Sequence, residues 1–149
     1  FTPVRQGVLP ALRSFFVFSV QEITRGGRGY WLWVIGLALF LPGTALFSWA
    51  MGVNPFFEKT VRIQTDRGHR VIDTGPYAYM RHPGYVGFSG WMLSTPLLLA
   101  STWAFIPALI SVVLLVIRTV REDRTLHEEL PGYAEYASRV RFRLIPGVW

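Results

Sequence analysis

Long apolar runs separated by polar loops dominate the pattern of this chain. Three of them are long enough to cross a bilayer as helices, at about residues 31–51, 84–100 and 103–120. The first two runs carry no charge, and the apolar part of the third ends before Arg118. A fourth apolar stretch, residues 8–20, contains Pro10 and Arg13 and fits either an interfacial helix or part of a longer span. The pattern predicts an all-α, polytopic integral membrane protein.

The spacing of the runs predicts which loops meet. Only Ser101 and Thr102 separate the second run from the third, so these two helices should form a tight hairpin whose outer ends share one membrane face. That arrangement brings the loop 52–83 and the tail 118–149 together. We expect this meeting to matter most for function, within a single membrane domain over residues 1–149. The first residue is Phe1 rather than Met, which leaves open whether earlier residues add further spans.

Charge indicates the side on which the loop and the tail lie. The loop holds five of the fifteen basic residues and the tail holds six, against four before the first run. The positive-inside rule then places both in the cytoplasm, although Arg25 and Arg28 on the opposite side conflict with it. The composition suggests a bacterial inner membrane. Only Lys59 is a lysine, which fits either carboxylate and phosphate recognition by arginine or a GC-rich genome.

Several kinds of chemistry are excluded or not expected. The chain has no cysteine, which excludes disulfides, thiolate metal sites and cysteine nucleophiles. His69, His82 and His127 lack the spacing of metal ligands, so no metal is expected. The glycines at 26–29 lack the spacing of a dinucleotide fingerprint. Nucleic acid is not an expected partner, because the positive charge flanks apolar spans.

The richest stretch lies at residues 75–87, where the loop enters the second run. Pro83 disfavours helix at His82 and suits a first helical position, so the helix should begin at Pro83. A site for an anion would then form at the free backbone N–H groups of Gly84, Tyr85 and Val86. Arg81 and His82 would add side-chain donors to this site. Alternatively, Arg81 extends to lipid headgroups and His82 caps the helix.

Small and aromatic residues surround this stretch. Glycine recurs at every third residue, at Gly84, Gly87 and Gly90, and Ser94 follows four residues later. They permit close approach of either a second helix or a ligand. Three tyrosines could stack on a base, face a sulfonium or simply anchor the protein at the interface: Tyr77, Tyr79 and Tyr85.

The end of the third run presents two opposite charges. Arg118 and Glu122 are four residues apart and share one helix face at the membrane surface. They form either an ordinary ion pair or a cation and an anion offered together to a zwitterionic ligand.

The loop and the tail have weaker patterns. Residues 61–64 alternate apolar and polar positions, so a short extended segment can form there. The tail should stay helical to Leu130, break at Pro131–Gly132, and resume through Tyr133 and Tyr136.

These motifs together resemble the isoprenylcysteine carboxyl methyltransferase family, to which the phospholipid N-methyltransferases look related. The resemblance runs from about Asn54 onward and rests on Gly75-Pro76-Tyr77, Arg81 to Gly87, Arg118, Glu122-Asp123, Leu126, and the Gly-Tyr-x-x-Tyr run at Gly132 to Tyr136. Two positions depart from the family pattern. Asp123 stands where Glu is usual, and Leu130-Pro131-Gly132 replaces the usual Phe-Gly.

The resemblance implies a helical membrane enzyme that uses S-adenosylmethionine, with a cofactor pocket built from the cytoplasmic loop, the start of the second span and the C-terminal tail. The matching cofactor positions are Gln64, His69, Arg70, Val71, Ile72, Tyr77, His82, Pro83, Gly84, Tyr85 and Glu122. Arg118 matches a catalytic arginine directed at the substrate carboxyl. The implied partners are the bilayer and a lipophilic small-molecule or lipid acceptor, most simply a carboxylate. The oligomeric state is not readable from the sequence.

Three alternatives remain open at this point. An NADPH-dependent reductase of the sterol reductase type has a similar Arg-His-Pro-x-Tyr motif, but usually with Asn where this chain has Gly84, and with a downstream Cys. A phospholipid amine N-methyltransferase would share the cofactor and differ in the acceptor. A non-catalytic membrane scaffold would bind neither cofactor.

Overall fold

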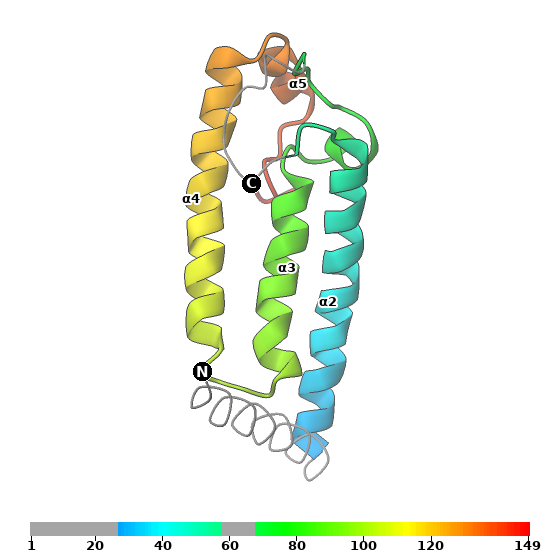
Figure 1. Ribbon diagram of the computed structural model, residues 1–149, viewed down its shortest axis with the longest axis vertical. Helices are drawn as coiled ribbons and strands as arrows, with labels where there is room; N and C mark the ends of the chain where they lie inside the picture. Colours follow the sequence, from blue (N-terminus) through cyan, green and yellow to red (C-terminus); the bar gives the residue numbers. More distant parts are fainter. Residues whose placement is uncertain (1–26, 58–67) are drawn as a thin grey trace, which may run out of the picture.

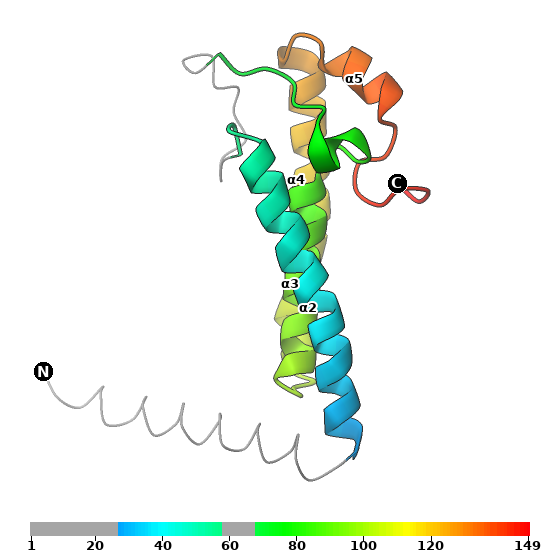
Figure 2. The same ribbon diagram turned by 90° about the vertical axis from the view of Figure 1, so that its right-hand side faces the viewer.

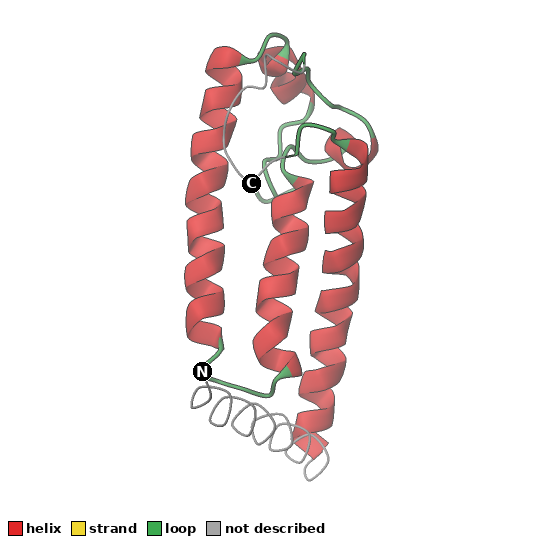
Figure 3. Cartoon of the chain, in the orientation of Figure 1, coloured by secondary structure: helices red, strands yellow, loops and turns green. Residues whose placement is uncertain are grey.

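Three long helices run side by side and define the shape of the protein (Figure 1). The computed structural model describes residues 27–57 and 68–149, and these form helices and loops with no strand, as predicted (Figure 3). The elements are α2 (Gly27–Val53), the 3-10 helix η2 (Gly75–Ala78), α3 (Pro83–Leu98), α4 (Phe105–Glu129) and α5 (Tyr133–Arg139). The all-α prediction is confirmed for this part of the chain.

Helix α3 packs against both of the other long helices. The chain ascends α2, descends α3 and ascends α4, while η2 and α5 gather at one end (Figures 1 and 2). The predicted hairpin between the second and third runs is therefore confirmed. Its connection is residues 99–104 rather than two residues, because α3 ends at Leu98 and Ala100 takes a left-handed conformation (φ 47°).

The contact between α2 and α3 depends on small residues. A Cβ atom at Gly87 would lie 2.6 Å from the carbonyl oxygen of Gly43 and 2.6 Å from the backbone nitrogen of Phe47. The spacing of Gly87 and Gly90 thus serves helix packing, one of the two readings of the sequence. Gly84 differs, because its added Cβ would collide with the ring of Phe57.

The tail folds back over the same end of the bundle. Helix α4 continues through the charged turns to Glu129, next to the predicted end at Leu130. Gly132 has a φ of +83°, which a glycine adopts without strain, and α5 follows it. The predicted break at Pro131–Gly132 is confirmed. Leu130, Tyr133 and Tyr136 then form a buried cluster between α4 and α5.

Length and composition single out α2 as a candidate membrane span. Within residues 29–53, the most apolar window of 18 residues has a mean hydropathy of 1.8, and only 17% of that window is buried inside the protein. Exposed apolar surface on this scale suits lipid rather than water. Helix α3 has 16 residues and the apolar part of α4 ends at Arg118, so the spans at 84–100 and 103–120 stay predictions.

Three sequence-based predictions lie outside the described residues: the apolar stretch 8–20, the extended segment 61–64 and the cofactor contact at Gln64. The neighbouring residues 69–72 lie in a loop.

Candidate functional site

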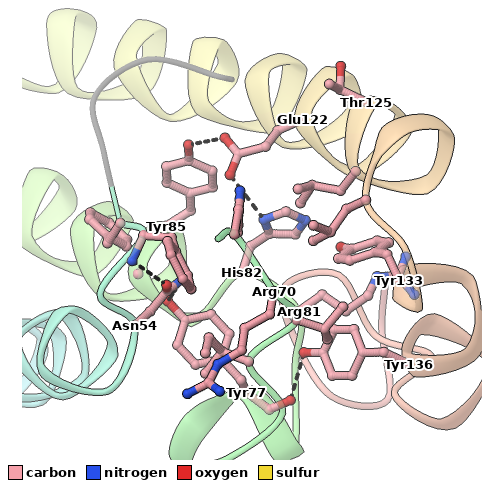
Figure 4. Close-up of a pocket in the computed structure, with 18 residues that line it drawn as sticks. Asn54, Arg70, Tyr77, Arg81, His82, Tyr85, Glu122, Thr125, Tyr133 and Tyr136 are labelled. Atoms are coloured by element: carbon pink, nitrogen blue, oxygen red, sulfur yellow. Dashed lines mark hydrogen bonds and ion pairs between the residues drawn. The ribbon is translucent and has the colours of Figure 1, made fainter. Parts of the chain in front are cut away.

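A cavity of about 90 Å³ lies where the loop, the start of α3, the second half of α4 and the tail meet. Its wall contains nine of the predicted cofactor residues: His69, Arg70, Val71, Ile72, Tyr77, His82, Gly84, Tyr85 and Glu122. These residues come from three separate segments of the chain, as the sequence predicted (Figure 4).

Backbone hydrogen bonds hold the loop against the tail. The N–H of Arg81 donates to the carbonyl of Phe142, and the N–H of His82 donates to that of Arg143, both at 2.9 Å. The predicted meeting of residues 52–83 with residues 118–149 is therefore confirmed. These two hydrogen bonds fix the backbone at His82 independently of its side chain.

The carboxylate of Asp123 is the centre of the polar network beneath the cavity. Arg81 makes a two-point contact with it, Nε to Oδ1 at 2.8 Å and Nη2 to Oδ2 at 3.0 Å. Arg143 Nε and the Tyr133 hydroxyl each donate to it at 2.8 Å. Asp123 is 2% exposed, so these contacts form in a region of low dielectric, where paired charges interact strongly.

The environment of Asp123 keeps it ionised. Burial by itself would raise the pKa of this carboxyl group. Hydrogen bonds from His82, Arg143, Tyr133 and Arg81 outweigh burial and hold its pKa well below the ordinary value. A permanent negative charge therefore balances the two arginines.

Arg81 has a different role from either one predicted. It does not extend to the membrane surface, because it is 8% exposed. It is not a donor reserved for a ligand either, because Asp123 takes Nε and Nη2, and the carbonyl groups of Val140 and Arg141 accept from Nη1 at 3.0 and 3.2 Å. Arg81 joins α4 and the tail to the loop.

His82 lies between two acids. Its Nε2 is 3.3 Å from Asp123 Oδ1, and its Nδ1 is 3.9 Å from Glu122 Oε1. His82 occupies the N-cap position of α3, but its side chain makes no capping hydrogen bond to the helix. The imidazole instead lies in the cavity wall between the network around Asp123 and the carboxylate of Glu122.

The start of α3 corrects a second expectation. Pro83 is the first residue of the helix, as predicted, and it does not line the cavity. The N–H groups of Tyr85 and Val86 both donate to the carbonyl of His82, at 3.1 and 3.4 Å. They are not free for an anion, because the first turn of the helix already uses them.

Arg118, Tyr85 and Glu122 form a chain of hydrogen bonds. Arg118 Nε donates to the Tyr85 hydroxyl at 2.7 Å, and that hydroxyl donates to Glu122 Oε2 at 2.5 Å. The direct distance from Arg118 Nε to Glu122 Oε2 is 3.8 Å. Arg118 is not among the described residues that line the cavity, and its catalytic role stays a prediction.

Tyr77 forms another side of the cavity and is held at both ends. Asn54 donates to its hydroxyl at 3.2 Å, and the hydroxyl of Tyr136 donates to its carbonyl at 2.7 Å. Burial raises the pKa of Tyr77 to about 12, so it stays protonated at neutral pH. Tyr79, by contrast, is 66% exposed and does not line the cavity.

Aromatic rings continue the wall toward the mouth. The rings of His69 and Phe56 lie 4.5 Å apart between centroids, at an angle of 30°. Burial lowers the pKa of His69, against the opposing charge of Glu122, and favours the neutral ring. Arg70 is exposed at this mouth.

The sequence reasoning missed several residues of the site. Asn54, Phe56 and Phe57 line the cavity from the end of α2, and Asp123 holds it from below. The signal for Asp123 was its place beside Glu122 in the motif shared with the family. Nothing in the pattern around residues 54–57 marked them as part of a site.

Comparison with known proteins places this geometry in a family. Residues 34–128 match the model of the isoprenylcysteine carboxyl methyltransferase family. The chain belongs to this family. The match covers α2, α3 and nearly all of α4, so it includes both sides of the cavity. Members of this family are integral membrane proteins, which agrees with the apolar surface of α2.

Individual members are similar over most of the chain. The human protein-S-isoprenylcysteine O-methyltransferase is 34% identical over 139 residues, which cover 87% of this chain and 44% of the relative. The protein of the same name from Xenopus laevis is 34% identical over 104 residues, 62% of this chain and 33% of the relative. The protein of the same name from Schizosaccharomyces pombe is 30% identical over 92 residues, which cover 62% of this chain and 35% of the relative. The chain thus spans less than half the length of these relatives.

The family match confirms the resemblance stated from the motifs. It disfavours a reductase of the sterol reductase type, which the shared Arg-His-Pro-x-Tyr motif had left open.

Proposed function

We propose that this chain carries the cofactor site of an integral membrane methyltransferase that uses S-adenosylmethionine and methylates the carboxylate of a lipophilic acceptor. The observation that carries the proposal is the meeting of His82 and Glu122, 3.9 Å apart, in one cavity between the first turn of α3 and the second half of α4. The names of the relatives, which are O-methyltransferases, support the reaction.

The residues around the cavity suit a zwitterionic sulfonium cofactor. The carboxylate of Glu122 can accept hydrogen bonds from an ammonium group. The faces of Tyr77 and Tyr85 are electron-rich and attract a cation. The rings of Phe56 and His69 offer a surface on which a purine can stack.

The size of the cavity sets a condition on binding. Typical ligand pockets measure roughly 300–1,000 Å³. A volume of about 90 Å³ therefore holds only part of such a cofactor. Side chains at the mouth, Arg70 among them, must move for the remainder to bind.

The reaction asks little acid–base chemistry of the protein. The cofactor supplies a methyl group on a positively charged sulfur, and a carboxylate attacks it without first losing a proton. The protein contributes orientation and exclusion of water, both of which accelerate a displacement that destroys charge. The rigid contacts around Asp123 serve this purpose, because they fix His82 and the start of α3.

The position of Arg118 indicates where the carboxylate of the methyl acceptor binds. It lies on α4 at the point where the apolar surface ends, with a side chain 35% exposed. A guanidinium at this depth suits the carboxylate of a molecule whose apolar part stays in the bilayer. We place α2, α3 and α4 across the membrane, with the cavity on the cytoplasmic side, where most of the basic residues lie.

A transfer assay tests the proposal. Membranes containing the protein are incubated with tritiated-methyl S-adenosylmethionine and a total lipid extract, and the labelled product is identified. We expect a base-labile methyl ester. A stable methylamine would indicate a phospholipid amine acceptor, and absence of protein-dependent label would contradict the proposal.

A further inference from the structure

The hydroxyl of Tyr85 makes a hydrogen bond to each of the two ends of the proposed active site, which are also joined by the 3.8 Å ion pair of Arg118 and Glu122. One end is Glu122 in the cavity, and the other is Arg118 outside it. Since Arg118 does not line the cavity, an effect of one end on the other has to pass through a shared contact.

The direction of this link is fixed by chemistry. A guanidinium can only donate hydrogen bonds, and an ionised carboxylate can only accept them. The tyrosine oxygen therefore accepts from Arg118 at 2.7 Å and gives its single proton to Glu122 at 2.5 Å. Without the hydroxyl, the 3.8 Å between Arg118 Nε and Glu122 Oε2 is too long for a hydrogen bond.

Two neighbours contact the ring of Tyr85. The Arg118 guanidinium carbon lies 5.6 Å from its centroid, and the His82 ring lies 5.8 Å away at an angle of 10°. Each oxygen of Glu122 then faces a different residue, Oε2 toward Tyr85 and Oε1 toward His82 (Figure 4). A shift of Arg118 must move the Tyr85 hydroxyl, and with it the carboxylate that faces the cavity.

We infer that Tyr85 is a positioning residue that couples occupation of the acceptor end at Arg118 to affinity for the cofactor at Glu122. The inference rests on the proposed function. When a carboxylate binds Arg118, the guanidinium is held in place, and the Tyr85 hydroxyl holds Glu122 in the orientation that an ammonium group requires. Binding of the acceptor therefore raises the affinity for the cofactor by a coupling factor. By linkage, the cofactor raises the affinity for the acceptor by the same factor.

The test measures this factor directly. The affinity of the purified protein for S-adenosylhomocysteine is determined in detergent micelles with and without N-acetyl-S-farnesylcysteine. We expect the wild-type protein to bind at least about fivefold more tightly with the farnesylated acid present, at the low end of typical couplings. In Tyr85→Phe, which keeps the ring and removes the hydroxyl, the factor should fall to about one.

Two further variants separate coupling from mere structural support. Arg118→Lys keeps the charge and removes the Nε donor, so it should weaken S-adenosylhomocysteine binding in the wild-type background and have no effect in Tyr85→Phe. Tyr79→Phe is the matched control, because Tyr79 is 66% exposed and does not line the cavity. It should keep the full factor.

The outcomes distinguish the inference from the function on which it rests. Binding of S-adenosylhomocysteine with no coupling in the wild type, or with the same coupling in Tyr85→Phe, overturns the inference alone. Absence of binding to the wild type overturns the proposed function and the inference with it.

Discussion

The guanidinium of Arg81 and the carboxylate of Asp123 form a buried two-point ion pair, with distances of 2.8 and 3.0 Å, across 42 positions of sequence. The pair joins the loop before α3 to the end of α4. Arg143 adds the tail to the same carboxylate. Three segments that hold the cavity therefore depend on one acid that does not itself line it.

Removing the charge of Asp123 should be costly. In Asp123→Asn, Arg81 stays buried without its anion, and losing one partner of a buried pair costs about 3–5 kcal/mol. We expect a large drop in the melting temperature of the purified protein in detergent. Glu128→Gln is the control, because its pair with Arg124 is exposed, and its melting temperature should stay that of the wild type. Equal stability of the two variants would contradict the role given to Asp123.

The same carboxylate should make the free energy of unfolding depend on pH in the acidic range. Its pKa is lowered in the folded protein, so its contribution is complete above the unfolded value of 3.8 and is lost as the pH falls further toward the folded pKa. Unfolding free energy measured from pH 6 to pH 2 should fall most steeply below about pH 4. Asp123→Asn should show a shallower fall, and parallel curves for the two proteins would speak against this assignment.

The order and direction of the helices could be predicted from the sequence, because each helix boundary depends on a local signal. Pro83 set the first residue of α3, the short polar link after Ala100 set the hairpin, and Pro131–Gly132 set the break before α5. These residues restrict their own backbone, so their effects can be predicted without knowing their neighbours.

The partners of the charged residues could not be predicted in the same way. Arg81 and Arg143 look like ordinary members of a basic loop and tail, and only the fold shows that both meet Asp123. Two of the N–H groups expected to be available, those of Tyr85 and Val86, take part in the first turn of α3 and donate to the carbonyl of His82, as usual at the start of a helix. Charge pairing between distant segments, by contrast, is a property of the folded chain.

Two glycines three residues apart should respond differently to alanine. At Gly87 the added Cβ meets the backbone of Gly43 and Phe47, which cannot yield without separating α2 from α3. Overpacking of this kind costs about 1–3 kcal/mol. Gly87→Ala should therefore lower the melting temperature, and an unchanged value would argue against close packing of these helices.

At Gly84 the added Cβ meets the end of the Phe57 ring, which can rotate. The ring lines the cavity, so its movement changes the shape of the binding site rather than the helix packing. Gly84→Ala should fold with nearly wild-type stability and bind S-adenosylhomocysteine about tenfold less tightly, within the 1–3 kcal/mol expected for a steric change. Calorimetric titration measures this, and unaltered affinity would place the cofactor elsewhere.

The most direct test of the account is methyl transfer by proteins altered at the two residues that meet in the cavity. Glu122→Gln removes the charge that faces the cofactor ammonium, and His82→Ala removes the ring between the two acids. Losing a hydrogen bond to a charged group costs about 1.5–3 kcal/mol, so each variant should lose roughly 10- to 150-fold in kcat/KM for S-adenosylmethionine. Glu122→Gln should keep its melting temperature, whereas His82→Ala also removes a buried ring that contacts Asp123 and should lower it. Wild-type kcat/KM in both variants would contradict the placement of the active site in this cavity.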